Sequence, residues 1–335
     1  MKILVVAPRY SPYIGGVEHV AQSLAERLAR RGHDVVVLAG EPRIDRPAEE
    51  EEVGGVSVVR WPTWSPGGAY HVPRRPRAFV EAVRELARGR DIVHVHSAHA
   101  VFAVMAGRAV LSTAKVVFSP HYHGGGHTAF RSFLWSVSWR SYVEGLIRGA
   151  EVVHAVSPVE AELLAEDFPR SRGKLRVLPN GVGEDVRRYR WTGQESDYAI
   201  FAGRLERYKG AREAAELVER LGLKLLVLGD GPCARELRRS GAEVRGFAPR
   251  EEYLAALAGA RYAVNLSRRE AFSVFIAEAL GMGVPSIVSP QIAKALGAEC
   301  DGRVGEYCIT ARADVHTWDE LVGKYEELYD EVASR

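Results

Sequence analysis

Two acidic residues, Glu270 and Glu278, mark the stretch of the sequence whose residue types best suit chemistry. Seven residues separate them, and the apolar residues between and beyond them recur at helical spacing. This pattern predicts a helix that begins near Ala271 and ends at Gly281 or Gly283. Glu270 is then expected just before the helix and Glu278 about two turns into it, so that the two carboxylates flank the helix start.

The start of this predicted helix suits an anion. Its first backbone N–H groups, around Phe272 to Val274, have no partner within the helix and carry partial positive charge, which favours a phosphate. Carboxylates beside a phosphate can accept hydrogen bonds from sugar hydroxyls. The pattern therefore indicates a nucleotide-sugar site. The alternative is that Glu270 caps the helix and that Glu278 lies on a solvated face.

Two cations, Arg204 and Lys209, stand five positions apart in GRLERYKG, directly after the apolar run Ala199 to Ala202 that predicts a strand. Together the two charges can clamp a diphosphate, with each charge-assisted hydrogen bond contributing about 1.5 to 3 kcal/mol. Each residue taken alone is also explained as a solvated surface charge. Their place in a glycine-bounded loop after a strand favours the diphosphate.

A glycine pair, Gly15 and Gly16, precedes the first predicted helix, and Glu18 is expected in its first turn. The three glycines of the dinucleotide-binding pattern G-x-G-x-x-G are absent from this loop. Because they lack side chains, Gly15 and Gly16 let the backbone approach a ligand at the carboxyl edge of a parallel sheet. A plain turn into the helix is the alternative.

Histidines gather after two predicted strands of the first half. One group ends the strand Ile92 to His96, and the other follows the strand Val116 to Ser119 in SPHYHGGGHT. No acidic or cysteine ligands accompany them, so no metal is expected. His121 is expected to hydrogen-bond a ligand hydroxyl, whereas satisfied side chains at a strand end are favoured for the histidines within the strand. The two groups are His94, His96 and His99, and His121, His123 and His127.

A predicted helix from Thr128 to Gly149 interleaves aromatic residues, among them Trp135, with arginines. Such a helix can lie on a membrane surface or meet a lipid-linked acceptor. A core helix with a broad apolar face is the alternative. Glu18, His123 and Trp135 are the residues expected on the acceptor side of a site.

Length and composition limit the function further. A chain of 335 residues exceeds one ordinary core, so two domains are expected. A net charge of +2 with 26% charged residues indicates a soluble globular protein without nucleic acid as a partner. No apolar run suits a signal peptide or a membrane span, so a cytoplasmic protein is expected. The three cysteines, Cys233, Cys300 and Cys308, are expected to be thiols.

Short apolar runs alternate with helical patterns in both halves of the chain. Ile3 to Ala7, a helix over Val20 to Arg31 and the run Val35 to Ala39 form a βαβ unit, which predicts a doubly wound parallel sheet. The polar stretch Glu184 to Asp197 is expected to link two such domains. Further strands are expected at Val56 to Arg60, Val152 to Val156, Leu175 to Leu178, Leu225 to Leu228, Glu243 to Phe247, Arg261 to Leu266 and Val284 to Val288.

An ordered set of motifs carries a resemblance to a known family. The chain contains SPYIGGVEHV, SPH, VLPNGV, FAGRLERYKG, VLGDGP and EAFSVFIAEALGMGVP, in that order. Together they resemble the retaining GT-B glycosyltransferases of family four. The resemblance implies an α/β fold of the GT-B type, with two Rossmann-like, doubly wound parallel-sheet domains facing an interdomain cleft. It also implies an acceptor domain over residues 1–183, a nucleotide-sugar donor domain over 184–316, and a terminal helix over 317–335 that packs back on the first domain.

The same resemblance implies roles for individual residues. Arg204 and Lys209 would hold the donor diphosphate. Glu270 would accept from hydroxyls of the donor sugar, and Glu278 from those of the ribose. His121 would contact the transferred sugar near the reacting carbon. The expected catalytic set is His121, Arg204, Lys209 and Glu270. The expected donor-binding set is Gly15, Gly16, Arg204, Lys209, Gly246, Phe247, Glu270, Ala271, Phe272, Ser273 and Glu278, in which Gly246 and Phe247 hold the base through the backbone.

The implied reaction is transfer of a hexose from a UDP- or GDP-linked sugar to an acceptor hydroxyl, with retained configuration and without a bound metal or other cofactor. The acceptor is expected to be a glycan or a lipid-linked sugar, and a peripheral contact with the inner face of the membrane is left open. A nucleotide-sugar epimerase of the same build and a catalytically silent binding protein are the alternatives. Two features depart from the family: Ala271 replaces its usual glycine, and the loop after Ser289 lacks its glycine pair and acid.

Overall fold

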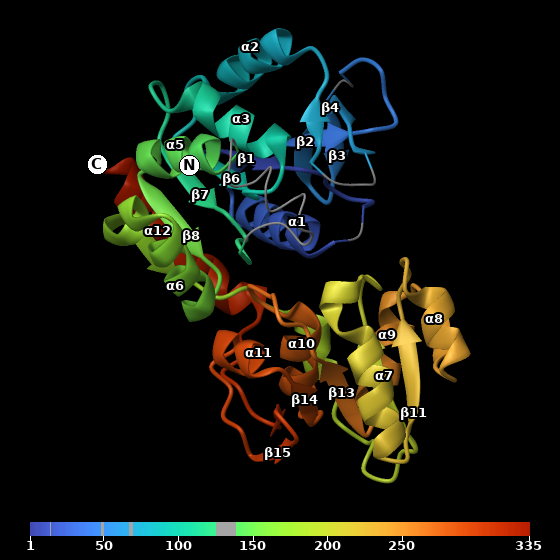
Figure 1. Cartoon of the computed structure of the whole chain (residues 1–335). Coiled ribbons are helices and arrows are strands. Elements are labelled where there is room, and N and C mark those ends of the chain that lie inside the picture. Colours follow the sequence, from blue (N-terminus) through green and yellow to red (C-terminus); the bar gives the residue numbers. More distant parts are fainter. Residues whose placement is uncertain (14, 48–49, 67–69, 125–138) are drawn as a thin grey trace. The chain divides into compact units, whose positions relative to one another are not determined.

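Two compact units make up the chain in the computed structural model. The first unit comprises Met1–Pro179 together with Trp318–Arg335, and the second comprises Asn180–Thr317 (Figure 1). The structure describes residues 1–13, 15–47, 50–66, 70–124 and 139–335. Each unit is built on its own mostly parallel sheet with helices on both faces. The predicted class, two doubly wound α/β domains, is confirmed.

The first sheet has the strand order β3-β4-β2-β1-β6-β7-β8-β9 among the described residues, with β5 paired to β4. Neighbours from β4 to β9 along this order are parallel, whereas β3 and β5 are antiparallel to β4 and were not predicted. The strands are β1 Lys2–Ala7, β2 Asp34–Glu41, β3 Glu51–Val53, β4 Val56–Trp64, β5 Val72–Pro73, β6 Ile92–His96, β7 Val116–Ser119, β8 Val152–Ala155 and β9 Leu175–Val177.

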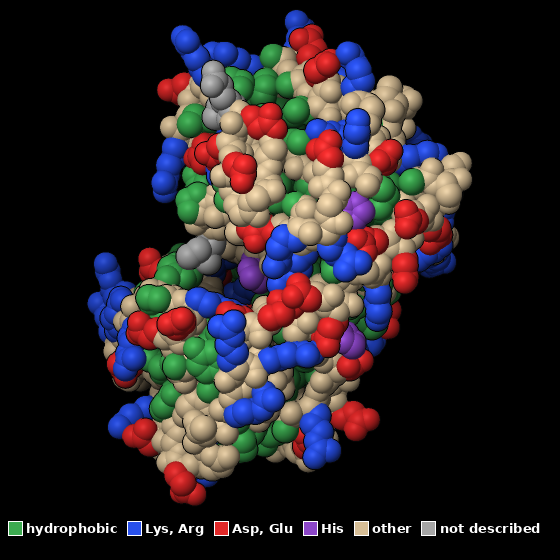
Figure 2. All heavy atoms as spheres, turned by 180° about the vertical axis from the view of Figure 1, so that it is seen from behind, with side chains coloured by type: hydrophobic (Ala, Val, Ile, Leu, Met, Phe, Trp, Pro, Cys, Tyr) green, Lys and Arg blue, Asp and Glu red, His purple; other side chains and the backbone are tan. Residues whose placement is uncertain are grey.

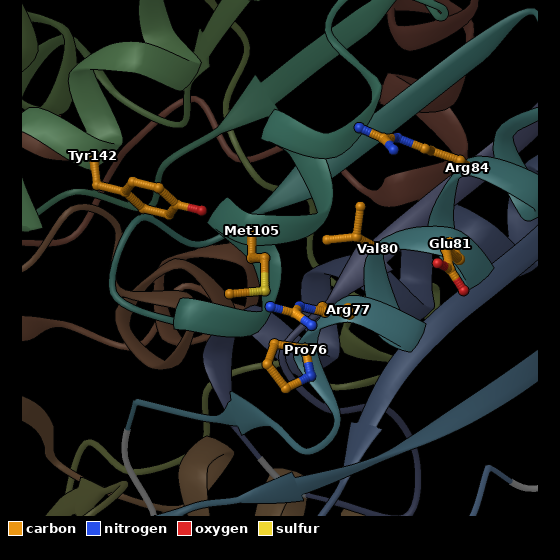
Figure 3. Close-up of a pocket in the computed structure, with 7 residues that line it drawn as sticks. All are labelled: Pro76, Arg77, Val80, Glu81, Arg84, Met105 and Tyr142. Atoms are coloured by element: carbon orange, nitrogen blue, oxygen red, sulfur yellow. The ribbon is translucent and has the colours of Figure 1, made fainter.

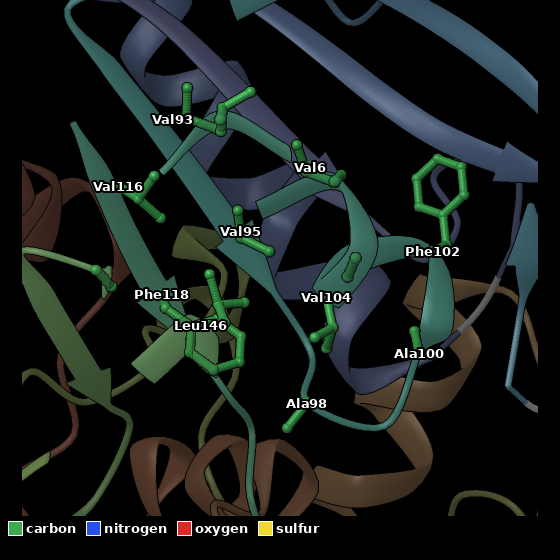
Figure 4. Close-up of a cluster of buried hydrophobic side chains, with 14 of the residues drawn as sticks. Val6, Val93, Val95, Ala98, Ala100, Phe102, Val104, Val116, Phe118 and Leu146 are labelled. Carbon is green, nitrogen blue, oxygen red and sulfur yellow. The ribbon is translucent and has the colours of Figure 1, made fainter. Parts of the chain in front are cut away.

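The two faces of this sheet bury alternate residues of the same strands. Leu4 and Val6 of β1 face a core formed with α2, α3 and α5, part of which is shown in Figure 4. Ile3 and Val5 face a core formed with α1 and α12. Burial on both faces explains why these strands have continuous apolar sequences. The helices of this unit are α1 Gly16–Arg30, α2 Pro76–Ala87, α3 Val101–Val110, α5 Arg140–Gly149, α6 Pro158–Asp167, the short 3₁₀ helix η3 Pro169–Lys174 and α12 Trp318–Ala333.

The second sheet has the order β12-β11-β10-β13-β14-β16-β15 among the described residues. Its strands from β12 to β14 are parallel, and the hairpin β15–β16 adds an antiparallel edge that was not predicted. The strands are β10 Tyr198–Ala202, β11 Lys224–Leu228, β12 Glu243–Gly246, β13 Tyr262–Asn265, β14 Ser286–Val288, β15 Gly302–Val304 and β16 Tyr307–Thr310. The helices are η4 Glu184–Arg188, η5 Arg207–Lys209, α7 Ala211–Arg220, α8 Ala234–Arg239, α9 Arg250–Ala258, α10 Val274–Met282 and α11 Pro290–Ala295.

The last helix, α12, belongs to the first unit although it ends the chain. Trp318, Tyr325 and Tyr329 on its apolar face are buried in the core that α1 and the first sheet share. The division between the units falls after Pro179 and after Thr317.

The stretch Glu184 to Asp197 is part of the second unit, and its prediction as a linker was wrong. Val186 is buried in the core of that unit, and the Trp191 indole N–H donates to the Ala260 carbonyl at 2.9 Å. Val186 and Trp191 anchor the segment to the second unit. The polar composition of the segment as a whole does not predict this packing.

Cys300 and Cys308 form a disulfide, so the prediction that all three cysteines are thiols was wrong for this pair. Cys308 lies in β16, whose hairpin with β15 turns the chain back and leaves the two Cα atoms 5.2 Å apart. The pairing was missed because the hairpin was missed. Cys233 is a buried free thiol.

Candidate functional site

The loops after β10 and β13 bring Lys209 and Glu270 together in the second unit. Because β10 and β13 are parallel neighbours, their carboxyl ends lie side by side at one edge of the sheet. The Lys209 ammonium lies 2.9 and 2.6 Å from the two carboxylate oxygens of Glu270, and both side chains are largely buried. The residue predicted for the diphosphate and the residue predicted for the sugar thus form one ion pair.

Arg204 lies in the same loop as Lys209, and its side chain is exposed. Its guanidinium donates to the Tyr208 hydroxyl at 3.5 Å. The loop passes close to the turn after β11, where a Cβ on Gly229 would lie 1.9 Å from the Gly203 carbonyl oxygen. Glycine at position 229 therefore lets the two loops touch, while Arg204 keeps a side chain that a ligand can reach.

Helix α10 begins later than predicted. Ser273 has an extended backbone, and its hydroxyl accepts from the Ile276 N–H at 3.4 Å, so the first helical residue is Val274. The predicted start near Ala271 was wrong because this serine caps the helix instead of continuing it. The N–H groups of Val274 and Phe275 are then the ones that an anion at this helix end would meet.

Glu278 of α10 is buried and begins a chain of polar contacts that reaches the surface at Arg250. The Tyr253 hydroxyl donates to one carboxylate oxygen at 2.6 Å, and Nη1 of Arg250 lies 2.6 Å from the other. Arg250 also donates to both oxygens of Asp185, at 2.8 and 2.9 Å. Burial raises the pKa of Glu278 although Arg250 opposes this, and the hydrogen bonds from Arg250 lower the pKa of Asp185. The carboxylate predicted for the ribose is thus held by two protein partners, which the sequence analysis did not include.

Strand β12 ends at Gly246, and Phe247 follows it; both were predicted to hold a base. Gly246 has a φ of 78°, in the left-handed region that favours glycine, and forms a bridge with Gly229. The Phe247 side chain is 53% exposed. The backbone and ring at this strand end are therefore accessible to a flat ligand, and binding of the base here stays a prediction.

In the first unit, the loop after β1 folds around Glu18. Helix α1 begins at Gly16, so Glu18 lies in the first turn as predicted, and its carboxylate is 3.3 Å from the Arg9 guanidinium. A Cβ on Gly15 would lie 2.2 Å from a Glu18 oxygen, whereas a Cβ on Gly16 would meet nothing within 4 Å. Gly15 thus makes room for the buried carboxylate, and Gly16 is the glycine with open space beside it.

The two histidine groups meet at the carboxyl ends of β6 and β7. His96 Nδ1 lies 3.1 Å from His121 Nε2, and the two rings stack with centroids 5.4 Å apart. Burial lowers the pKa of His121 to about 3, so this imidazole is neutral near pH 7. Within the described residues, no group of three His, Cys, Asp or Glu side chains has the geometry of a metal site.

Glu160 of α6 holds the loop that carries His121. Its buried carboxylate accepts from the N–H groups of Tyr122 at 2.5 Å and Val156 at 2.7 Å, and burial raises its pKa to about 7. His121 has a φ of 48°, a left-handed conformation that its surroundings must hold in place. The sequence analysis did not include Glu160, although the S-x-x-E spacing from Ser157 was an available signal.

Of the residues predicted on the acceptor side, His123 stacks on His99 with ring centroids 4.4 Å apart. Trp135 lies outside the described residues, as do His127 and the first part of the helix predicted from Thr128 to Gly149. The described part of that helix is α5, which buries apolar side chains in the core and exposes its arginines. This part therefore matches the alternative of a core helix.

An open groove of about 420 Å³ crosses the outer surface of α2, α3 and α5. Its lining combines apolar surface from Val80, Met105 and Tyr142 with charged groups from α2 (Figure 3). These charged groups are the guanidinium groups of Arg77 and Arg84 and the carboxylate of Glu81. The groove lies on the helical layer and not at the strand ends, so it is separate from the residues predicted to bind the donor. Cations and acids are otherwise mixed over the surface, as Figure 2 shows for one face. No helix in the described ranges has both the length and the apolar character that crossing a membrane requires.

Comparison with known proteins decides the family. The sequence model of Glycosyltransferase Family 4 matches residues 14–186, which is more than half of the chain. The chain belongs to this family. A second model, Glycosyl transferases group 1, matches residues 196–328 of the same glycosyltransferase. The family predicted from the motifs is confirmed.

Two curated relatives and one solved structure agree with this assignment. The glycosyltransferase is 28% identical over 312 residues to a GDP-mannose:cellobiosyl-diphosphopolyprenol alpha-mannosyltransferase of Xanthomonas campestris, covering 86% of this chain and 78% of that protein. It is 26% identical over 380 residues to a GDP-mannose-dependent alpha-mannosyltransferase of Mycolicibacterium smegmatis, covering 98% of each. A sucrose-phosphate synthase structure from Thermosynechococcus elongatus aligns with a TM-score of 0.77 at 15% identity over 99% of both chains. That likeness shows the fold, which is the predicted GT-B fold.

Proposed function

We propose that this glycosyltransferase moves mannose from GDP-mannose to an acceptor hydroxyl with retained configuration. The observation that carries the proposal is the Lys209–Glu270 ion pair at the carboxyl ends of β10 and β13, directly before helix α10. A cation, a carboxylate and a helix start together match a diphosphate joined to a sugar. Both relatives described above are named for GDP-mannose, which favours this donor over a UDP-linked hexose.

In this proposal the second unit holds the leaving diphosphate. Lys209 and the exposed Arg204 place positive charge where negative charge develops on the phosphate oxygens, which stabilises the transition state more than the ground state. The N–H groups at the start of α10 add partial positive charge. These groups supply the neutralising charge, and the proposed reaction is therefore independent of a metal ion.

Glu270 has two partners in the proposed cycle. Its carboxylate and the Lys209 ammonium hold each other in place in a largely buried setting. When a diphosphate binds to the Lys209 ammonium, the Glu270 carboxylate can accept hydrogen bonds from hydroxyls of the donor sugar. The ion pair thus prepares both groups before the substrate arrives.

The first unit contributes His121 to the transferred sugar. Because the pKa of His121 is about 3, its imidazole is a weak base near pH 7 and is poorly suited to remove the proton of the acceptor hydroxyl. That proton goes instead to an oxygen of the leaving phosphate. Attack from the same face as the leaving group then gives retention.

A lipid-linked glycan is the acceptor that we propose for this cytoplasmic enzyme. One relative is named for a diphosphopolyprenol-linked acceptor. In the groove over α2, α3 and α5, apolar side chains such as Met105 and Tyr142 lie beside Arg77 and Arg84. This combination suits the headgroup region of an anionic membrane, where a peripheral contact would bring the enzyme to its acceptor.

Hydrolysis of the donor in the absence of acceptor tests this function. The enzyme is incubated with GDP-mannose or UDP-glucose, the released nucleotide is measured, and the free sugar is followed by proton NMR. We expect GDP release with α-mannose formed first, because the bond in GDP-mannose is α. Release of UDP alone would correct the donor, and β-mannose formed first would exclude retention. Tight binding of GDP-mannose without turnover would indicate a silent binding protein.

A further inference from the structure

A cluster of four histidines along β6, β7 and β8 of the first unit divides into a closed half, with His94 and His154, and an open half, with His96 and His121. In the closed half, His154 Nε2 lies 2.9 Å from the Leu178 carbonyl oxygen, which can only accept, so the neutral ring carries its proton there. His154 Nδ1 then accepts from the Ser119 hydroxyl at 2.6 Å. Ser119 in turn accepts from His94 Nε2 at 2.7 Å, which leaves His94 Nδ1 to accept from the Tyr329 hydroxyl at 2.6 Å. Every ring nitrogen of this half has a partner.

The open half consists of His96 and His121. Their contact joins His96 Nδ1 to His121 Nε2 at 3.1 Å. The other nitrogen of His96, Nε2, is buried and has no hydrogen-bond partner among the residues that the structure describes. One of the two facing nitrogens must donate, so two proton arrangements are available to this pair of neutral rings.

The cost of burial selects between these arrangements. If His121 donates, His96 accepts through Nδ1 and must carry its own proton on Nε2, as a buried N–H without a partner. If His96 donates through Nδ1, its Nε2 is a bare acceptor. Among backbone groups, a buried N–H without a partner is rarer than a carbonyl short of a hydrogen bond, and we expect the same order for these ring nitrogens. The second arrangement is therefore favoured, and His121, which accepts through Nε2, carries its proton on Nδ1.

We propose that His96 is a positioning residue that holds His121 in the Nδ1–H tautomer, so that His121 meets its ligand as a hydrogen-bond donor. This inference rests on the proposed function, in which His121 faces the transferred sugar. A donor at this place binds an oxygen lone pair of the sugar and offers the acceptor hydroxyl no imidazole lone pair. His94, two residues earlier on the same face of β6, is fully satisfied and provides a matched control.

NMR of the free enzyme tests the tautomer directly. Long-range ¹H–¹⁵N spectra of histidine-labelled protein separate protonated from unprotonated ring nitrogens, and a His121→Gln variant assigns the signals. We expect the proton of His121 on Nδ1 in the unaltered enzyme and in His96→Asn, whose side-chain amide can donate from the place of Nδ1. In His96→Leu we expect a mixture of tautomers.

Two NMR results would overturn the proposal. The first is protonation of His121 on Nε2 in the unaltered enzyme. The second is an unchanged His121 signal in a folded His96→Leu variant. Should His96→Leu not fold, the unaltered enzyme and His96→Asn still decide the question.

Turnover of GDP-mannose tests whether the tautomer matters. His96→Leu is expected to lower kcat for GDP release about tenfold, the effect of one hydrogen bond, with KM changed less than about twofold. His96→Asn should restore kcat to within about threefold. His94→Leu should lower the Tm and lower kcat per folded molecule much less than His96→Leu does, because its hydrogen bonds are confined to the closed half and it contacts His96 only by ring packing, with centroids 4.2 Å apart.

The outcomes separate this inference from the proposed function. If the unaltered enzyme releases no GDP from GDP-mannose, the proposed donor fails while the NMR spectra still decide the tautomer. If the unaltered enzyme turns over and folded His96→Leu keeps full kcat, the inference fails and the proposed function stands.

Discussion

The strand ends of the two units carry opposite kinds of chemistry. In the second unit, Lys209 pairs with Glu270 and Arg250 with Glu278, so opposite charges face each other. Along β6, β7 and β8 of the first unit a cluster of histidines has pKa values that burial lowers, so these rings are neutral near pH 7; they are His94, His96, His121 and His154. The ends of β10 and β13 in the second unit thus present paired charges, whereas the ends of β6 and β7 in the first unit present neutral hydrogen-bonding groups.

This difference matches the two kinds of partner in the proposed reaction. A departing diphosphate gains negative charge and needs cations in place before the bond breaks. A sugar hydroxyl stays neutral and needs oriented donors and acceptors. The lesson is that two sheets of the same class carry different sites, because the side chains in the last residues of the strands and in the loops after them differ.

Acidification should give the largest difference in stability between the two units. The pKa of His154 is about 4 in the folded unit, against an ordinary 6.5 in the unfolded chain. The folded unit therefore has its full stability above pH 6.5, and its free energy of unfolding decreases as the pH falls below 6.5. At pH 5 this shift of the His154 pKa costs about 2 kcal/mol of the free energy of unfolding, and the pKa of about 3 of His121 adds a similar cost. Glu160, whose pKa is raised to about 7, acts in the opposite direction and offsets about one histidine. Hydrogen exchange at pH 5 should show β6, β7 and β8 losing protection first.

The second unit is the internal control in this measurement, since His316 is the one histidine between residues 180 and 317 of the sequence. Equal loss of protection in both units at pH 5 would contradict the contrast between them.

Removal of the Lys209 charge should have the next largest effect. We expect Lys209→Ala to lower kcat/KM for donor turnover by about 10²- to 10³-fold, as for other groups that stabilise charge in a transition state. Nucleotide release measures the change. Lys224→Ala is the matched control, because that lysine is 78% exposed and pairs with Asp197 at the opposite, amino end of β11. A Lys209→Ala variant with unaltered kinetics would remove the diphosphate clamp.

Opening the Cys300–Cys308 disulfide should destabilise the second unit alone. Loop-closure entropy predicts a loss of about 2 to 3 kcal/mol for a loop this short. Denaturant unfolding with and without reductant measures it, with exchange in β14 and β16 as the local readout. A double variant with serine at both positions should not respond to reductant, and a response there would show that another group is involved.

Reversal of two charges in the groove of the first unit should have the smallest effect. Each arginine near an anionic membrane contributes about 1 kcal/mol, so Arg77→Glu with Arg84→Glu should weaken binding to phosphatidylglycerol-containing vesicles at least about tenfold. Vesicle sedimentation measures the affinity, and vesicles of phosphatidylcholine alone provide the neutral reference. Arg238→Glu with Arg239→Glu, in α8 of the second unit, is the matched control. Equal weakening by both pairs would show that no particular face is used.

The parallel cores could be predicted because their signal is local. A strand buried on both faces is a continuous apolar run, and β6 and β7 have the predicted bounds. Antiparallel edges depend on contacts between distant segments, so the hairpin β15–β16 and its disulfide were missed. The capping of α10 by Ser273 was missed for another reason, since serine is also tolerated within a helix.

The sequence predicted which residues belong to the candidate site, but not which residues they contact. Lys209 and Glu270 were identified from their loops, yet their pairing depends on the adjacency of β10 and β13. Both partners of Glu278, Arg250 and Tyr253, come from α9, and Arg250 in turn binds Asp185 from the segment that was predicted to be a linker. Likewise, His94 and His96 lie on the same face of β6 and are both buried. Only the surrounding hydrogen bonds distinguish His94, whose two ring nitrogens have partners, from His96, whose Nε2 has none among the described residues.

Because α12 belongs to the first unit, that unit can complete its fold only after the second unit has been synthesised. The ribosome makes all of the second unit before it makes the last helix of the first, so the nascent first unit waits with the apolar surface of α1 uncovered. His94 receives its Tyr329 partner only after α12 has left the exit tunnel. A stop codon before Trp318 would therefore damage the half of the enzyme that was translated first.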